Sequence, residues 1–161
     1  VAEFPYGQGN FVMDVILPDD QSGLASIIAQ VDNESFAGWT GQLAERETDV
    51  SFPRFKYGYK KTMKEVLADM GMGIAFTESA DFSNISDQFD LLINDVTHQT
   101  FIETNEEGTE AAAATVVTVG TTSMPPPALI FNMDHPFIYV IRETTTNSII
   151  FMGRVTDPSM N

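Results

Sequence analysis

The chain has 161 residues, no cysteine, and 23 Asp and Glu residues against eight Lys and Arg, which gives a net charge of −15. This charge argues against nucleic acid or an anionic membrane surface as a partner, because both repel an acidic protein. The lack of cysteine excludes disulfides, thiol nucleophiles and thiolate metal sites, and no apolar run reaches the ~20 residues that cross a bilayer. A hydrophobic fraction of 43% is sufficient for the core of about one domain.

The first third of the chain is predicted to form a strand followed by two short helices. Phe11–Leu17 alternates and is apolar, and Pro18-Asp19-Asp20 closes it as a turn. Ser22 is placed to cap a helix over Gly23–Val31, in which apolar residues recur at helical spacing. Glu34–Leu43 is predicted as a second short helix.

The rest of the chain is predicted to be mostly strands. Asp49–Tyr59 alternates as an extended segment. Thr62–Met70 is predicted as a third helix, in which Thr62 and Glu65 have the spacing of a capping box. Phe89–Glu103 is predicted as a long strand. Three closing strands are predicted over Leu129–Phe131, Phe137–Arg142 and Ser148–Arg154.

The stretch Asn105–Ser123 has an unusual composition, with four alanines followed by Thr, Val and Gly, and no proline, aromatic residue or charge after Glu110. In a strand, its alternating residues would all point to one face. These seven are all small or β-branched and uncharged: Thr109, Ala111, Ala113, Thr115, Val117, Val119 and Thr121. The segment is therefore suited both to a loop and to a buried strand. Four alanines also favour a surface helix, which would still permit insertion into a sheet.

Three motifs, in the same order along the chain, resemble motifs of the serpin family. Glu106-Glu107-Gly108-Thr109-Glu110 and the alanines after it are similar to the hinge of a serpin reactive-centre loop. Residues 131–158, FNMDHPFIYVIRETTTNSIIFMGRVTDP, resemble the C-terminal signature, and residues 51–86 resemble the strand, helix and loop that lead towards the hinge. The resemblance implies an α+β serpin fold of large mixed β-sheets with helices, here its mostly β C-terminal portion with about three short helices.

The resemblance also implies that residues 1–161 are the C-terminal part of a single serpin domain. The opening VAEFPYGQGNFVMDVILPDD resembles the family's mid-sequence pair of strands, and a complete serpin is well over twice as long. We therefore expect a fragment, or one piece of a nicked or two-chain molecule, with the missing N-terminal portion as a partner. The resemblance also leads us to expect a secreted or extracellular protein.

In the family, residues 105–128 correspond to the reactive-centre loop of a protease inhibitor. A serine or cysteine protease attacks this loop as a suicide substrate, forms an acyl-enzyme, and is trapped when the loop inserts into the large sheet. The residues similar to the hinge are Glu107, Gly108, Thr109, Glu110, Ala111, Ala112, Ala113 and Ala114. Counting from the hinge glycine places the reactive bond at Thr122–Ser123, and cleavage at Val117, Val119 or Thr121 is the alternative.

The composition of the loop also predicts the class of target protease. No Lys or Arg occurs between Lys64 and Arg142, whereas a trypsin-like protease needs a cation in its specificity pocket. Thr and Val fit small, shallow pockets, so the resemblance leads us to expect an elastase-like or subtilisin-like target.

The two histidines are predicted to be structural. The resemblance assigns His98 to the shutter, a polar cluster that controls the opening of the large sheet and whose other members lie in the missing portion, and it makes His135 part of the C-terminal signature. With two His, no Cys and no HxxxH or GxSxG pattern, we expect no catalytic residue, metal site, cofactor or enzyme activity. The alternatives are a non-inhibitory serpin with a carrier, storage or chaperone role, and an inactive half-serpin fragment.

Overall fold

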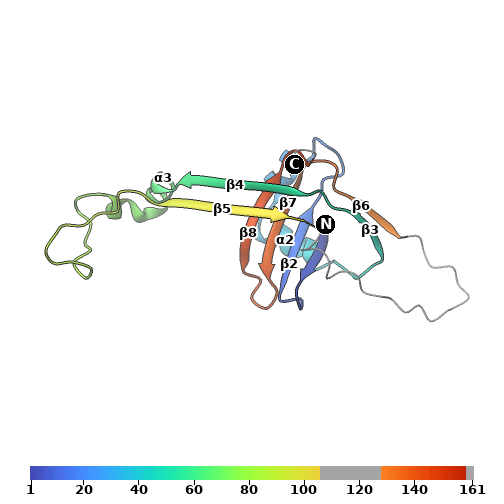
Figure 1. The fold of residues 1–161 in the computed structure, drawn as a ribbon, viewed down its shortest axis with the longest axis horizontal. Helices are drawn as coiled ribbons and strands as arrows, with labels where there is room; N and C mark the ends of the chain where they lie inside the picture. The colour runs from blue at the N-terminus through green and yellow to red at the C-terminus, as the bar shows by residue number, and fades with distance from the viewer. Residues whose placement is uncertain (106–127, 159–161) are drawn as a thin grey trace, which may run out of the picture. The chain divides into compact units, whose positions relative to one another are not determined.

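The computed structural model describes residues 1–105 and 128–158, which belong to two compact units (Figure 1). The larger unit comprises Val1–Phe55 together with Thr104–Asn161, and the smaller unit comprises Lys56–Glu103. Within the described residues the elements are strands in three sheets and three short α-helices. The fold is therefore α+β, as the sequence predicts.

The larger unit is built on an antiparallel sheet with the strand order β1-β2-β7-β8. The strands span Ala2–Tyr6 (β1), Phe11–Ile16 (β2), Phe137–Glu143 (β7) and Ile149–Val155 (β8). β1 and β2 form a hairpin whose turn contains Gly7 and Gly9, both with positive φ, a conformation that glycine adopts without steric cost. The three strands predicted in this sheet are confirmed to within one residue at each end.

Two short helices, α1 (Leu24–Gln30) and α2 (Asn33–Thr40), cover one face of this sheet. The sheet contributes Ile16, Ile138 and Val140 to the contact, all of them buried. Five half-buried side chains in and beside the helices pack against these three: Leu24, Ile27, Val31, Phe36 and Trp39. The apolar spacing predicted within Gly23–Val31 is confirmed for Leu24, Ile27 and Val31, whereas Ile28, at the same spacing, is 43% exposed.

The cap predicted for α1 is wrong. Gly23 is the N-cap residue, and no side chain caps the helix. Ser22 bonds backwards instead, because both its N–H and its Oγ donate to Asp20 Oδ1, at 2.8 and 2.6 Å. Gly23 occupies the N-cap position, so Ser22 lies one residue before it, and the Ser22 side chain is directed to Asp20 instead of to the N–H groups of the first helical turn. In α2 the cap is Asp32, whose side chain accepts from the Ser35 N–H at 2.8 Å.

Aromatic rings gather on the opposite face of the sheet. Phe55 is 4% exposed, and its ring centroid lies 6.0 Å from that of Phe137 and 5.7 Å from that of Tyr139. Phe52 stacks on Phe55 at 6.3 Å, and Phe4 meets Phe52 edge-on at 5.6 Å. Aromatic pairs of this kind contribute about 0.5–1.5 kcal/mol each beyond their buried area. The cluster therefore holds the segment around Phe55 firmly against β7.

Gly153 is required by the packing of Tyr139, its partner across the β7–β8 ladder. A Cβ at Gly153 would lie 2.8 Å from Cε1 of the Tyr139 ring. We expect Gly153→Ala to lower the free energy of unfolding by about 1–3 kcal/mol, because overpacking displaces the ring. Gly38→Ala is the matched control, since Gly38 lies in α2 with open space around it and alanine favours a helix. Urea denaturation measures the free energy of unfolding of both variants. A value for Gly153→Ala equal to that of the parent protein would contradict this packing.

A second sheet in the larger unit pairs β3 (Thr48–Ser51) with β6 (Leu129–Asn132) in parallel. The single extended segment predicted over Asp49–Tyr59 is wrong, because the chain breaks after Ser51 and a new strand begins at Phe55 in a different sheet. Pro53 lies at this break and has no N–H with which to continue a ladder.

The smaller unit contains most of a two-stranded sheet of β4 (Phe55–Thr62) and β5 (Thr97–Thr104). After β4 come the short helix α3 (Lys64–Leu67), a π-helical turn over Ala68–Met72 and a 3-10 turn over Gly73–Phe76. The Met63 N–H donates to the Val96 carbonyl at 2.7 Å and closes the far end of the sheet.

Two predictions in the smaller unit are wrong. The capping box of Thr62 and Glu65 is absent, because Met63 is the N-cap of α3 and no side chain caps it. The long strand predicted over Phe89–Glu103 is shorter, since β5 begins only at Thr97. At Ile93 the backbone N–H donates to the Ala75 carbonyl, which is a contact to the 3-10 turn and not to a strand.

Candidate functional site

The predicted reactive-centre loop, residues 105–128, connects β5 to β6. Only its terminal residues, Asn105 and Ala128, are described. The predicted hinge and bond residues all lie outside the described residues: Glu107, Gly108, Thr109, Glu110, Ala111, Ala112, Ala113, Ala114, Val117, Val119, Thr121, Thr122 and Ser123. Their roles stay predictions, and the site is therefore built from the two strands that flank them.

The upstream flank is held by the last two residues of β5. Thr104 Oγ1 accepts a hydrogen bond from the Phe55 N–H at 3.0 Å and lies 3.3 Å from the Phe55 carbonyl oxygen, to which it can donate. Glu103 forms an ion pair with Lys56 at 3.1 Å. Because Phe55 is part of the aromatic cluster, the end of β5 is tied to a well-packed position directly before the predicted loop.

The downstream flank is held by β6. The Leu129 N–H donates to the Glu47 carbonyl at 3.1 Å, and the Met133 N–H donates to the Ser51 carbonyl at 3.0 Å. Between them, the Phe131 ring lies 6.4 Å from that of Phe4. Ile130, which alternates with Phe131, is 79% exposed. Both ends of the predicted loop are therefore fixed by ladder hydrogen bonds and aromatic contacts.

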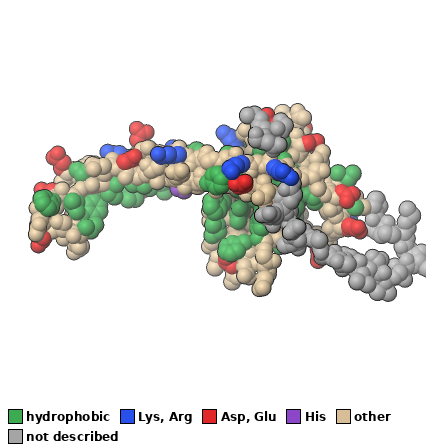
Figure 2. All heavy atoms as spheres, viewed as in Figure 1, with side chains coloured by type: hydrophobic (Ala, Val, Ile, Leu, Met, Phe, Trp, Pro, Cys, Tyr) green, Lys and Arg blue, Asp and Glu red, His purple; other side chains and the backbone are tan. Residues whose placement is uncertain are grey.

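The two strands of the smaller unit's sheet differ at their free edges. Among the described residues β4 and β5 pair only with each other, so each leaves one edge without a strand partner. Five of the eight Lys and Arg residues lie between Arg54 and Lys64, a stretch without Asp or Glu. Figure 2 shows Lys and Arg side chains, together with Asp and Glu side chains, along one side of this unit and apolar side chains on the other. Lysines on an edge strand such as β4 oppose pairing with a further strand. The free edge of β5 is therefore the better position for an added strand.

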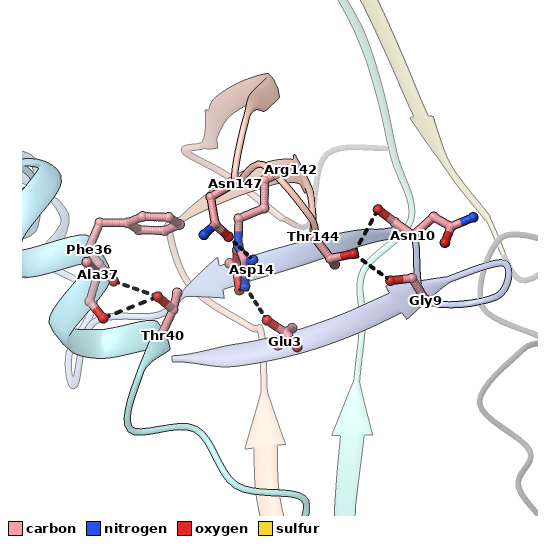
Figure 3. A network of polar contacts seen from close by, with 10 residues as sticks. All are labelled: Glu3, Gly9, Asn10, Asp14, Phe36, Ala37, Thr40, Arg142, Thr144 and Asn147. Carbon is pink, nitrogen blue, oxygen red and sulfur yellow. Dashed lines mark hydrogen bonds and ion pairs between the residues drawn. The ribbon is translucent and has the colours of Figure 1, made fainter.

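A buried ionic network lies in the main sheet of the larger unit (Figure 3). Arg142 on β7 donates from Nε to Asp14 Oδ2 at 2.7 Å, and Asp14 is completely buried in β2. The remaining guanidinium nitrogens bond Glu3 on β1 and Asn147 beyond β7. Burial raises the pKa of the Glu3 carboxyl, and the Asp14 charge adds to this, while Arg142 opposes it. Every polar group here has a partner, so the network stabilises three strands and offers no reactive group.

Sequence reasoning missed this network, although the sequence contains a signal for it. Asp14 interrupts the apolar run of β2, and Arg142 ends an apolar run in β7. The ladder pairs Asp14 with Val140 and Val12 with Arg142. Asp14 and Arg142 are therefore diagonal neighbours on adjacent strands, and their side chains lie on the same face of the sheet. An acid and a base in two adjacent buried strands therefore indicate a structural ion pair.

The predicted shutter residue, His98, lies near the start of β5 and is exposed in the described chain. The resemblance places its partners in another part of the serpin domain, so the shutter role stays a prediction. Among the described residues, no group of three or more His, Cys, Asp or Glu side chains is arranged to hold a metal ion. Within the same residues no helix has the length and apolarity that a membrane span requires.

Comparison with known proteins identifies the family. The serpin profile, described as serpin (serine protease inhibitor), matches residues 1–158. Iripin-3 of Ixodes ricinus is 37% identical over 155 residues, which cover 96% of this chain and 39% of that protein. Leukocyte elastase inhibitor A of Mus musculus is 39% identical over 165 residues, which cover 98% of this chain and 43% of that protein. The chain therefore belongs to the serpin family.

The solved structures agree with this assignment. Human thyroxine-binding globulin, solved in complex with thyroxine, superposes with a TM-score of 0.75 at 27% identity, over 92% of this chain and 38% of that one. The chain spans about two fifths of the length of the relatives it matches. The fold expected from the sequence is thus confirmed as a serpin fold. Members of this family generally act as inhibitors rather than as catalysts.

Proposed function

We propose that the complete protein is a protease inhibitor that acts as a suicide substrate. The observation that carries this proposal is the connection between β5 and β6, in which residues 111–124 contain no charge and no proline. The strand before it, β5, has one edge without a strand partner among the described residues. A cleaved segment of this composition is suited to form a new strand along that edge.

The mechanism begins with attack of the protease's nucleophile on the carbonyl carbon of Thr122. The bond to Ser123 breaks, the Ser123 amine leaves with a proton, and the protease stays attached to Thr122 as an ester or thioester. The loop then inserts beside β5 and carries the acyl-enzyme away from its original position before water hydrolyses the bond. The ends at Thr104 and Leu129 are held by their own hydrogen bonds, so the segment between them is the part that moves.

The target is proposed to be an elastase-like or subtilisin-like serine protease, with a cysteine protease as a further possibility. The absence of Lys and Arg between Lys64 and Arg142 supports this choice. The name of one relative, leukocyte elastase inhibitor A, agrees with it. We also propose a location outside the cell, where such proteases act, which detection of the protein in the culture medium of its source would test.

Inhibition kinetics with matched proteases test the specificity of the proposed site. The parent protein should inactivate an elastase-like protease progressively and leave a trypsin-like protease active. Thr122→Arg should reverse this preference, so that the trypsin-like protease is inactivated and the elastase-like protease stays active, because arginine at the reactive bond fits the anionic pocket of a trypsin-like protease. If Thr122→Arg left the specificity unchanged while Val119→Arg or Thr121→Arg reversed it, the reactive bond would lie at the alternative position.

A carrier role is the second candidate, and the similarity to thyroxine-binding globulin favours it. A carrier needs no strand insertion. It would be cleaved in its loop without trapping the protease and without the gain in heat stability that a new strand provides. Thermal unfolding before and after loop cleavage therefore separates the two candidates.

A further inference from the structure

His135 lies in the connection between β6 and β7, and both of its ring nitrogens have partners. Nδ1 is 2.7 Å from Asp134 Oδ1, and Nε2 is 2.8 Å from the carbonyl oxygen of Pro18. Pro18 follows β2, 117 residues earlier in the chain. The His135 side chain is only 13% exposed. The ring therefore joins two distant segments of the larger unit.

Both partners of His135 are hydrogen-bond acceptors. A backbone carbonyl oxygen has no hydrogen to donate, and neither has an ionised carboxylate. Neutral imidazole carries one N–H and can satisfy only one of the two, whereas imidazolium carries two and satisfies both. Asp134 is itself held in place, because its Oδ2 accepts from Asn132 Nδ2 at 2.8 Å. The arrangement thus matches the protonated ring.

The charges that face the ring favour the same form. Asp134 comes from the ring's own segment and Asp20 from the turn after β2, and both are acids. The hydrogen bond to Asp134 raises the pKa of His135 above 6.5, the Pro18 carbonyl adds to this, and partial burial opposes it. Two acids and a carbonyl outweigh the cost of partial burial.

We propose that His135 is a pH-sensitive latch, which as imidazolium ties the β6–β7 connection to the turn after β2 and which loosens when it loses a proton. Met133, two residues before His135 on the β6 side, is 2% exposed, and its N–H donates to the Ser51 carbonyl. The latch therefore acts on the strand that forms the downstream flank of the predicted loop. This proposal rests on the described contacts alone and does not depend on the proposed inhibitory function.

The direction of the pH effect follows from the raised pKa. The stabilisation is fully present below the unfolded-state pKa of 6.5, and it is lost as the pH rises through the higher value in the folded protein. Deprotonation removes one hydrogen bond and two charge attractions from the ring. The β6–β7 connection should consequently be held more tightly in mildly acidic than in mildly basic solution.

Nitrogen NMR of the histidine rings in the complete protein tests the protonation state. The signals that vanish in His135→Gln are assigned to His135. We expect both of its ring nitrogens to remain protonated above pH 6.5, and Asp134→Asn to lower the titration midpoint. A midpoint at or below the value in the urea-unfolded protein would overturn the proposal.

Hydrogen exchange at the Met133 amide tests whether protonation of His135 stabilises the β6–β7 connection. After correction for intrinsic rates, exchange should accelerate between about pH 6 and about pH 9, by roughly tenfold for each unit by which folding raises the pKa. His135→Gln should abolish this pH dependence, because glutamine keeps a donor for the Pro18 carbonyl but does not titrate. Exchange that is independent of pH in the parent protein, or equally dependent in His135→Gln, would show that the ring is only a structural contact.

Discussion

Ala111→Glu is expected to convert the proposed inhibitor into a substrate, so that nearly every protease molecule cleaves the loop and is released. Insertion of residues 109–121 would gain ladder hydrogen bonds of roughly 1 kcal/mol each, on the order of ten kcal/mol in total. A glutamate on the inward face of the new strand would reduce the free energy gained on insertion by several kcal/mol, because an unpaired carboxylate would be buried. Slower insertion gives water time to hydrolyse the acyl-enzyme. The measured quantity is the number of inhibitor molecules consumed for each protease molecule inactivated.

Ala112→Glu is the matched control for Ala111→Glu. Residue 112 lies between two inward positions and would share the outward face with Glu110. A charge on that face stays in solvent, so the stoichiometry should remain near that of the parent protein. An equal loss of inhibition in both variants would show that the alternation predicted for this segment is wrong.

Arg142→Met is expected to lower the free energy of unfolding by about 3–5 kcal/mol, because it leaves the Asp14 carboxylate buried without its counter-charge. Asp14 is 0% exposed and the Arg142 side chain 10%. The same change also frees the Glu3 carboxyl and the Asn147 side chain from their shared partner. Urea denaturation followed by fluorescence measures the loss.

The double variant Asp14→Leu with Arg142→Met separates the ion pair from simple loss of packing. Replacement of both charges by apolar residues of similar size is often close to neutral, so much of the lost stability should return. Lys61→Met, at an exposed position, should change stability by less than about 0.5 kcal/mol. If the double variant were as unstable as Arg142→Met, the unpaired Asp14 charge would not be the cause.

The sequence predicts the strands β2 and β7 well because nearly every residue in each is buried, so that each appears as a short, mostly apolar run. In β7, Phe137 and Tyr139 face the aromatic cluster while Ile138 and Val140 face the helices, so the run is apolar throughout and bounded by polar residues. Helix caps are predicted poorly because several polar groups compete for each one. Ser22 is held by Asp20, an outcome that depends on the turn before the helix.

Elements whose limits depend on distant contacts are also difficult to predict. The predicted strand over Phe89–Glu103 looks uniformly extended in the sequence, yet β5 begins only at Thr97, and before it the Ile93 N–H donates to Ala75 in the 3-10 turn instead of to β4. Pro53 marks the break after Ser51 in the sequence, but the packing of the Phe52 and Phe55 rings, which accompanies the change of sheet, is not visible in any local pattern.

The candidate site shows the same division between local and long-range information. The family is evident from ordered motifs, and its assignment is confirmed. The Asp14–Arg142 pair and the His135–Pro18 contact join residues more than a hundred positions apart, and they follow only once strand register is known. The hinge and the reactive bond remain predictions from the resemblance.

The most direct test of the inhibitory account is incubation of the complete protein with an elastase-like protease, followed by denaturing gels and mass spectrometry. The account predicts a complex that survives SDS, with the protease's nucleophile esterified to the carbonyl of Thr122 and a released peptide that begins at Ser123. Complete cleavage of the loop with active protease and no such complex would contradict it and would leave a substrate-type or carrier serpin.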